Sequence, residues 1–406
     1  MTEIDLKKSA FSEKHLIAHG KKPFTNDPWF GRQLLPGQDF IGEADFLSLD
    51  DAAAEIKASN KRVLLNIGDS STAGWDTRVT AVNKQRLKKE EPLILAFFQY
   101  PNYSDVLRQQ AGEQLIVLNA GIPGHTTLQG VRRNRKLLEG LKERGITPDY
   151  VSFYFGNNDC QWENNVEDKY LVRSNLPLFL DKQRIKHRKP DFERIHLRTN
   201  LRDFEANVRM MLRDARHFGA IPMVILPETP IYWEPGFRFV ADNFLIKDDS
   251  PGANMVNAAL AKATKLWENA KETDWSVQKA ADLSKASELD FVIPRIKTAY
   301  RKVLESVARN ANVPLVRTRI PREDNDIEYF VDYCHPIGDA NVQIATKLQE
   351  MIKACDEGHY ADAGERGSLL MRLLDSNLFG FIGRVLSRGK SSSTDSDASD
   401  DIYTLY

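Results

Sequence analysis

Five short apolar runs, separated by longer stretches with helical periodicity, constrain the fold of this chain most strongly. The runs lie at residues 62–67, 114–119, 150–155, 221–227 and 313–317, and the last is short and partial. Helical patterns, with apolar residues mostly three or four positions apart, cover 128–144, 201–218, 294–311 and 339–354. A strand buried on both faces reads as a continuous apolar run, and strands that alternate with helices predict βαβ units. We therefore expect an α/β fold with a parallel sheet of about five strands and helices on both faces.

The chain of 406 residues divides into three parts by composition. We expect an irregular, proline-broken N-terminal arm over residues 1–60 that ends in a short helix from Asp50 to Ser59, followed by the main domain over 61–355. Two connections in that domain, at about 160–200 and 231–293, are longer than ordinary loops and are expected to be functional insertions. The second contains a helical pattern from Ala253 to Glu272.

The third part, residues 356–406, combines an amphipathic segment with a polar tail. Leucine and phenylalanine recur at helical spacing over 368–388, and three arginines interrupt them. Such a helix lies on a membrane surface, contacts another protein, or docks on the chain's own core. The Ser/Asp-rich stretch that follows is low in complexity and is expected to be disordered.

Bulk composition excludes several function classes. The net charge of −1 gives no global attraction to nucleic acid. No apolar run reaches the roughly 18 residues of a membrane span. The N-terminal residues lack the apolar region of a signal peptide. The three cysteines are too scattered for a disulfide framework and show no zinc-binding spacing. We therefore expect a cytoplasmic protein without a metal or other cofactor.

Three residues suggest nucleophilic catalysis. Ser70 follows the first apolar run, and ligands bind at the carboxyl ends of parallel strands. Asp332 and His335 are three positions apart, just before Pro336. His335 is suited to take the Ser70 proton while Asp332 orients the imidazole. The alternatives are a helix-capping serine, a surface aspartate and a histidine at a helix entry.

Two further residues are candidate donors to a developing oxyanion. Gly124 offers a backbone N–H that no side chain blocks, and Asn158 offers a side-chain amide without adding charge. The alternative interpretations are a turn glycine and a polar residue at a loop tip.

The ordered set of motifs resembles the SGNH hydrolases, also called the GDSL esterase/lipase family. The matching blocks begin at Gly68, Asn119, Gly156 and Asp332, and the resemblance spans roughly residues 61–353. It implies a flavodoxin-like three-layer α/β/α sandwich and metal-free ester hydrolysis. It also implies Ser70, Asp332 and His335 as the catalytic residues, with an oxyanion hole formed by Ser70, Gly124 and Asn158.

From these residues we expect a serine esterase or deacylase that removes a short acyl group from a carbohydrate or another polar small molecule. The alternatives are an acyltransferase that uses the same acyl-enzyme and a non-catalytic module that binds a glycan or a partner. A basic stretch within 182–202 could attract an anionic substrate, and the alternative interpretation is a solvated surface helix. It contains Lys182, Arg184, Lys186, Arg188, Lys189, Arg194, Arg198 and Arg202.

Overall fold

The computed structural model describes most of the chain between residues 49 and 360. The described residues are 24–27, 31–34, 49–75, 101–162, 167–171, 194–236, 251–321 and 326–360. The amphipathic segment at 368–388, the tail that follows it and the basic residues from 182 to 189 lie outside this set.

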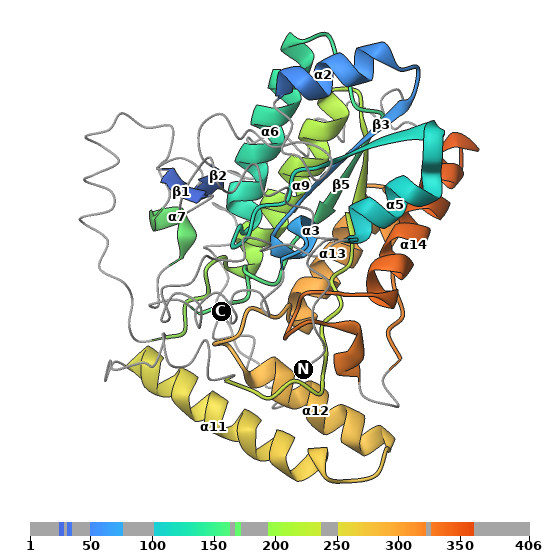
Figure 1. Ribbon diagram of the computed structural model, residues 1–406. Helices are drawn as coiled ribbons and strands as arrows, with labels where there is room; N and C mark the ends of the chain where they lie inside the picture. Colours follow the sequence, from blue (N-terminus) through green and yellow to red (C-terminus); the bar gives the residue numbers. More distant parts are fainter. Residues whose placement is uncertain are drawn as a thin grey trace, which may run out of the picture.

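A five-stranded parallel sheet forms the centre of the fold (Figure 1). Its order, β4-β3-β5-β6-β7, places the first core strand second from the edge. This is the 2-1-3-4-5 order of flavodoxin-like sheets, so the expected fold class is confirmed. The strands are β3 (Arg62–Gly68), β4 (Leu115–Asn119), β5 (Tyr150–Tyr154), β6 (Ile221–Ile225) and β7 (Leu315–Val316).

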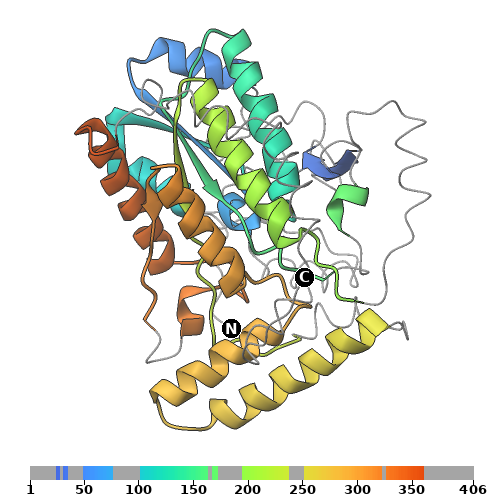
Figure 2. The same cartoon turned by 180° about the vertical axis from the view of Figure 1, so that it is seen from behind.

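Helices cover both faces of the sheet, and the strand residues alternate between them. Leu65 and Ile67 pack into the core under α2 (Leu49–Ala58), α6 (Thr127–Glu143), α9 (Leu201–His217) and α13 (Thr298–Asn310). Leu64 packs into the opposite core under α5 (Tyr103–Ala111) and α14 (Asp339–Asp356). Figure 2 shows the first layer from behind. The result is three layers with two apolar cores.

The structure contains two local elements that were not predicted from the sequence. The N-terminal arm, expected to be irregular up to its helix, contains an antiparallel hairpin of β1 (Phe24–Asp27) and β2 (Gly31–Leu34). Its strands are short and mostly polar, so backbone pairing forms them without apolar alternation. Helix α5 was not predicted because it has only nine residues. A capping box between Asn102 and Asp105 fixes its start.

The second long connection forms a helical hairpin of α11 (Pro251–Lys271) and α12 (Val277–Leu289) (Figure 1). The first of these confirms the helix expected over 253–272. Helix α12 was not predicted because its apolar residues are sparse. The first connection contains the short helix α7 (Asp168–Leu171). Among the described residues, no helix is both long enough and apolar enough to cross a membrane.

Candidate active site

The candidate nucleophile lies at the carboxyl end of β3. Asp69 caps the short helix α3 (Ser70–Ala73) by accepting the Ser71 N–H at 2.8 Å. Asp69, not Ser70, is therefore the capping residue, and the Ser70 hydroxyl is free of that role. Ser70 is 8% exposed. The strand-to-helix turn thus presents a nearly buried serine at the sheet edge where ligands bind.

Ser70, His335 and Asp332 form a continuous hydrogen-bonded chain. His335 Nε2 lies 2.7 Å from Ser70 Oγ, and His335 Nδ1 lies 2.6 Å from Asp332 Oδ2. The second Asp332 oxygen accepts the backbone N–H groups of Cys334 and His335 at 2.9 and 3.0 Å. Burial alone would raise the pKa of Asp332, but the neighbouring His335 and these hydrogen bonds hold it below its ordinary value. Asp332 is therefore charged at neutral pH, and its hydrogen bond with Nδ1 fixes the orientation of the His335 imidazole.

A tight turn carries Gly124. The His125 N–H donates to Ile122 O at 3.2 Å, with Pro123 second and Gly124 third in the turn. Gly124 has a φ of 81°. Proline followed by a residue of positive φ is the arrangement of a type II turn, which requires glycine at the third position. Such a turn does not use the N–H of its third residue, so the Gly124 N–H is not consumed by the turn itself.

Asn119 and Gly121 bring this loop close to α3. Asn119 donates its amide to Thr72 O at 2.7 Å and accepts the Gly121 N–H at 3.1 Å. A Cβ at Gly121 would lie 2.3 Å from Ala73 N. The block of residues 119–121 therefore fixes the end of β4 against α3, the helix that begins with Ser70.

Asn158 reaches the same place from the end of β5, but its amide is not free. Its Nδ2 atom donates to Asp69 Oδ2 at 3.2 Å and to His125 O at 3.1 Å. Both bonds are at the long end of the normal range. The structure thus brings together Ser70, Gly124, Asn158, Asp332 and His335, and adds Asp69 as the acceptor that orients Asn158.

Two buried carboxylates were missed by sequence reasoning. Burial raises the pKa of Asp69 to about 7, against the lowering effect of the Ser71 hydrogen bond. Burial likewise raises the pKa of Asp159 to about 6, against its bonds from Thr127. Asp159 accepts both the hydroxyl and the backbone N–H of Thr127, which tethers the Asn158 loop to α6. Each aspartate is adjacent to a candidate site residue and follows an apolar run, and this was the available signal.

The end of the second long connection packs against the Asn158 loop. Asn157 Oδ1 accepts the Ile296 N–H at 3.0 Å, and the Trp162 N–H donates to Phe291 O at 2.8 Å. Asn157 is therefore a structural anchor between this connection and the loop, although it is adjacent to Asn158 in sequence.

Among the described residues, one group of side chains has the composition of a metal site. Ligand atoms of Asp332, Cys334 and His335 lie within 4.8 Å of one another. However, Asp332 Oδ2 and His335 Nδ1 already bond each other. A metal ion there would have to break the chain that leads to Ser70.

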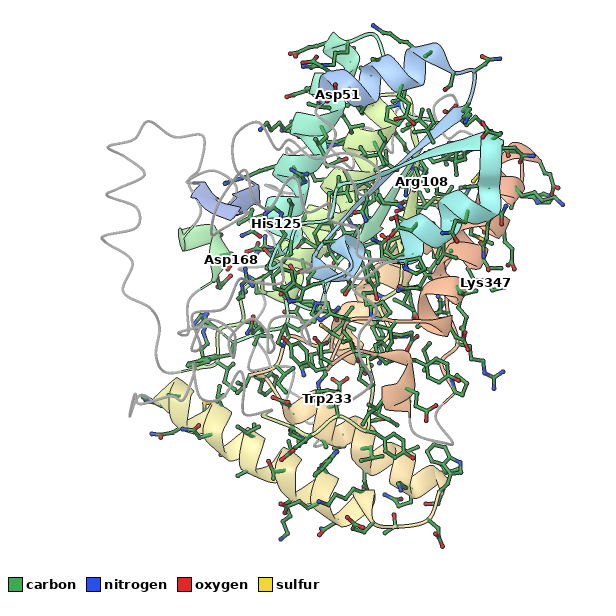
Figure 3. All side chains as sticks on the ribbon, viewed as in Figure 1. Asp51, Arg108, His125, Asp168, Trp233 and Lys347 are labelled. Carbon is green, nitrogen blue, oxygen red and sulfur yellow. The ribbon has the colours of Figure 1, made fainter. Side chains whose placement is uncertain are left out.

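The basic stretch does not behave as a uniform solvated surface. Of its described members, Arg198 turns inward and forms an ion pair with Asp168 at 3.0 Å, with only 12% of its side chain exposed. Figure 3 labels Asp168 and His125, which lie on the same side of the molecule near α7. Arg198 is therefore a structural cation and not a free site for an anionic substrate.

One family model and several solved structures match this chain. The family model described as "GDSL-like Lipase/Acylhydrolase family" matches residues 67–340. A search of curated proteins finds no match. Three similar solved structures are a lipase/acylhydrolase from Enterococcus faecalis, the enzyme LAE5 from the metagenome of Lake Arreo in Spain, and the acetylxylan esterase Axe2 from Geobacillus stearothermophilus.

Their sequence identities are 16%, 17% and 17%, and their TM-scores are 0.35, 0.36 and 0.34. The alignments cover 72%, 73% and 73% of this chain and 96% of each of the three. The family match extends over more than half of the 406 residues. The chain belongs to the GDSL-like lipase/acylhydrolase family and is a hydrolase that acts on esters.

Proposed function

We propose that the protein is a serine esterase or deacylase that works through an acyl-enzyme on Ser70. The observation that carries this proposal is the chain from Ser70 Oγ through His335 to Asp332, with contacts of 2.7 and 2.6 Å. Both distances are within hydrogen-bond reach, which is the geometric requirement for a nucleophile and its base.

In the first half of the reaction, Ser70 Oγ bonds to the ester carbonyl carbon and its proton passes to His335 Nε2. The tetrahedral intermediate then expels the alcohol, which takes that proton from His335. In the second half, water attacks the acyl carbon, gives its proton to His335, and the proton returns to Ser70 as the acid leaves. Asp332 stays charged throughout and stabilises the imidazolium.

In this proposal, the Gly124 and Ser70 N–H groups and the Asn158 amide stabilise the oxyanion. Asn158 has two amide hydrogens, and both have acceptors in the substrate-free protein. In this mechanism one of these long bonds is exchanged for a bond to the oxyanion. Hydrogen bonds that tighten only in the transition state accelerate the chemical step.

The near-complete burial of Ser70, His335 and Asn158 favours a small acyl group. Asn158 and the buried carboxylates around it make the surroundings polar. We therefore propose a short acyl group on a carbohydrate or another polar small molecule as the substrate class.

A covalent-probe experiment tests the assignment. A fluorophosphonate should label the full-length protein at Ser70 and abolish hydrolysis of an aryl acetate, and Ser70→Ala should lose both properties. Ser71→Ala is the matched control, because it removes the neighbouring hydroxyl and keeps the Ser71 N–H that Asp69 accepts. Turnover retained by Ser70→Ala but lost in Ser71→Ala would move the nucleophile by one residue. Turnover retained by both variants would remove serine catalysis.

We propose a cytoplasmic setting, with which the three buried free cysteines are compatible. We also propose a peripheral contact with a membrane or a protein through residues 368–388. Co-sedimentation with anionic vesicles of the full chain, compared with a chain ending near residue 364, tests this contact.

A further inference from the structure

The backbone of the turn that carries Gly124 is held from two sides. Arg198 Nη2 donates to Gly124 O at 2.9 Å, and Asn158 Nδ2 donates to the next carbonyl, His125 O, at 3.1 Å. Gly124 is the partly exposed residue in an otherwise buried loop. These contacts hold the two peptide units that follow Gly124. Glycine permits a wide range of backbone angles, so holding these units limits the φ and ψ angles of Gly124, which in turn set the direction of its N–H.

Arg198 is itself fixed by a carboxylate in a two-point ion pair. Its Nε lies 3.1 Å from Asp168 Oδ1, and its Nη2 lies 3.0 Å from Asp168 Oδ2. The side chains are 12% and 5% exposed, so solvent screens the pair little. Two parallel bonds to a planar guanidinium define its orientation as well as its position.

The same carboxylate reaches back to the residues that follow Gly124. Asp168 Oδ2 accepts the Thr126 hydroxyl at 2.9 Å and the Gln129 amide at 3.0 Å. Thr126 and Gln129 form the capping box at the start of α6. Asp168 and Arg198 therefore link the turn, the helix start and the first long connection into one rigid network.

We propose that Arg198, held by Asp168, is a positioning residue that aims the Gly124 N–H at the oxyanion. This gives the first long connection a function, because it contributes Arg198 and Asp168, which support the backbone that carries the Gly124 donor. The inference rests on the proposed serine esterase function. It concerns the rate of the chemical step, since Arg198 binds the Gly124 carbonyl and acts on the Gly124 N–H through the backbone angles at the Gly124 Cα.

The test compares Arg198→Met, Arg198→Lys and Asp168→Asn with the wild type on an aryl acetate. A misdirected donor should lower kcat, by up to about a hundredfold, while KM changes less than about twofold. Arg198→Lys keeps the charge, but its single ammonium cannot reproduce the planar arrangement of donors that binds both Asp168 and Gly124 O. We therefore expect its kcat to lie between those of the wild type and Arg198→Met. Fluorophosphonate labelling of Ser70 should slow in parallel, because that reaction also develops charge on an oxygen in the hole.

The matched control is Arg202→Met, which removes an exposed arginine from the start of α9 and should leave kcat unchanged. Melting temperatures of all variants identify losses that are due to unfolding, and Arg198→Lys serves as the test if Arg198→Met does not fold. Wild-type kcat in folded Arg198→Lys and Asp168→Asn, or a loss confined to KM, would overturn the inference. It would leave the proposed function intact as long as Ser70→Ala is inactive and unlabelled. Turnover by Ser70→Ala would instead overturn the proposed function.

Discussion

The carboxylate of Asp69 accepts a hydrogen bond from the Asn158 amide, with 3.2 Å between Oδ2 and Nδ2. The residue before the candidate nucleophile thereby orients a candidate oxyanion donor that is 89 positions away. The ionised carboxylate accepts this bond, whereas a proton on Oδ2 would oppose it. The ionisation of Asp69 is therefore coupled to the orientation of Asn158.

Asp69→Asn tests this coupling. An asparagine can offer its single oxygen to Ser71 or to Asn158, but not to both as Asp69 does. One neutral hydrogen bond contributes about 1 kcal/mol, so kcat should fall roughly three- to tenfold. The measurement is steady-state hydrolysis of an aryl acetate at pH 8. An unchanged kcat would show that Asn158 orients without Asp69.

The same substitution has an effect on stability that depends on pH. The folded-state pKa of Asp69 is raised from 3.8 to about 7, so the folded protein holds that proton more tightly than the unfolded chain. The contribution of Asp69 to stability is complete below about pH 4 and is lost as the pH rises through 7. The melting temperature of the wild type, relative to Asp69→Asn, should therefore decrease from pH 4.5 to 8. Parallel curves would contradict the raised pKa of Asp69.

Removing the Asn158 amide should reduce kcat much more than it changes KM. Loss of one oxyanion donor typically lowers turnover about 10²–10³-fold, which is the expected result for Asn158→Ala. Asn157→Ala is an unsuitable control, although it is the neighbouring residue, because Asn157 anchors Ile296. The exposed Asn310→Ala is the appropriate control. A change in KM alone would assign Asn158 to substrate binding.

The sequence predicted the sheet and the placement of the site well because both depend on strong local patterns. Runs such as 62–67 and 150–155 are mostly apolar, which is typical of strands buried on both faces of a parallel sheet. Parallel strands end at one edge, so residues that follow such runs meet there. Weak patterns failed: the hairpin at Phe24–Leu34 and helix α12 carry little apolar periodicity.

The supporting residues could not be predicted because their partners are distant in sequence. Arg198 was part of a basic stretch and indistinguishable from its neighbours, yet it contacts Gly124, 74 positions earlier. Asn157 and Asn158 look alike in sequence, but one anchors Ile296 and the other contacts Asp69. Burial and pairing of this kind depend on the assembled fold.

Activity should fall with decreasing pH as His335 gains a proton. An imidazole must be neutral to accept the serine proton, and histidine ordinarily titrates near ~6.5. The pKa of Asp332 is held below its ordinary value, so Asp332 remains charged over this range. Because the pKa of Asp69 is also raised to about 7, Asp69→Asn should remove one of the titrations that contribute to the acid limb. Full activity well below pH ~5 would exclude His335 as the base.

Zinc should inhibit the enzyme, and EDTA alone should leave it active. A zinc ion bound by Asp332, Cys334 and His335 would take one imidazole nitrogen, and so would break the hydrogen bond of His335 either to Asp332 or to Ser70. Hydrolysis should therefore decline with added zinc and recover on chelation. Cys334→Ser should weaken the inhibition, since it removes the thiolate ligand. Activity that is lost in EDTA and restored by a metal would contradict the metal-free mechanism.

The buried ion pair between Asp290 and Arg295 should be essential for stability. Both side chains are fully buried, with 2.8 Å between Arg295 Nη2 and Asp290 Oδ2. Asp290 also accepts the Gly236 N–H at 3.0 Å, and Arg295 donates to Trp233 O at 3.3 Å, so the pair ties together both ends of the second long connection. Figure 3 shows Trp233 beside the helical hairpin of α11 and α12. Arg295→Met leaves the buried Asp290 carboxylate without its ion-pair partner, and breaking a buried ion pair typically costs about 3–5 kcal/mol.

The measurement is urea unfolding of the full-length variants, with the exposed pair of Arg317 and Glu305 as the control. Arg317→Met should lower the free energy of unfolding by less than about 1 kcal/mol, because solvent screens that pair. The double variant Asp290→Asn/Arg295→Met should lose less than the sum of the two single variants, since it removes both charges. Equal losses in Arg295→Met and Arg317→Met would show that the Asp290–Arg295 pair does not hold the connection in place.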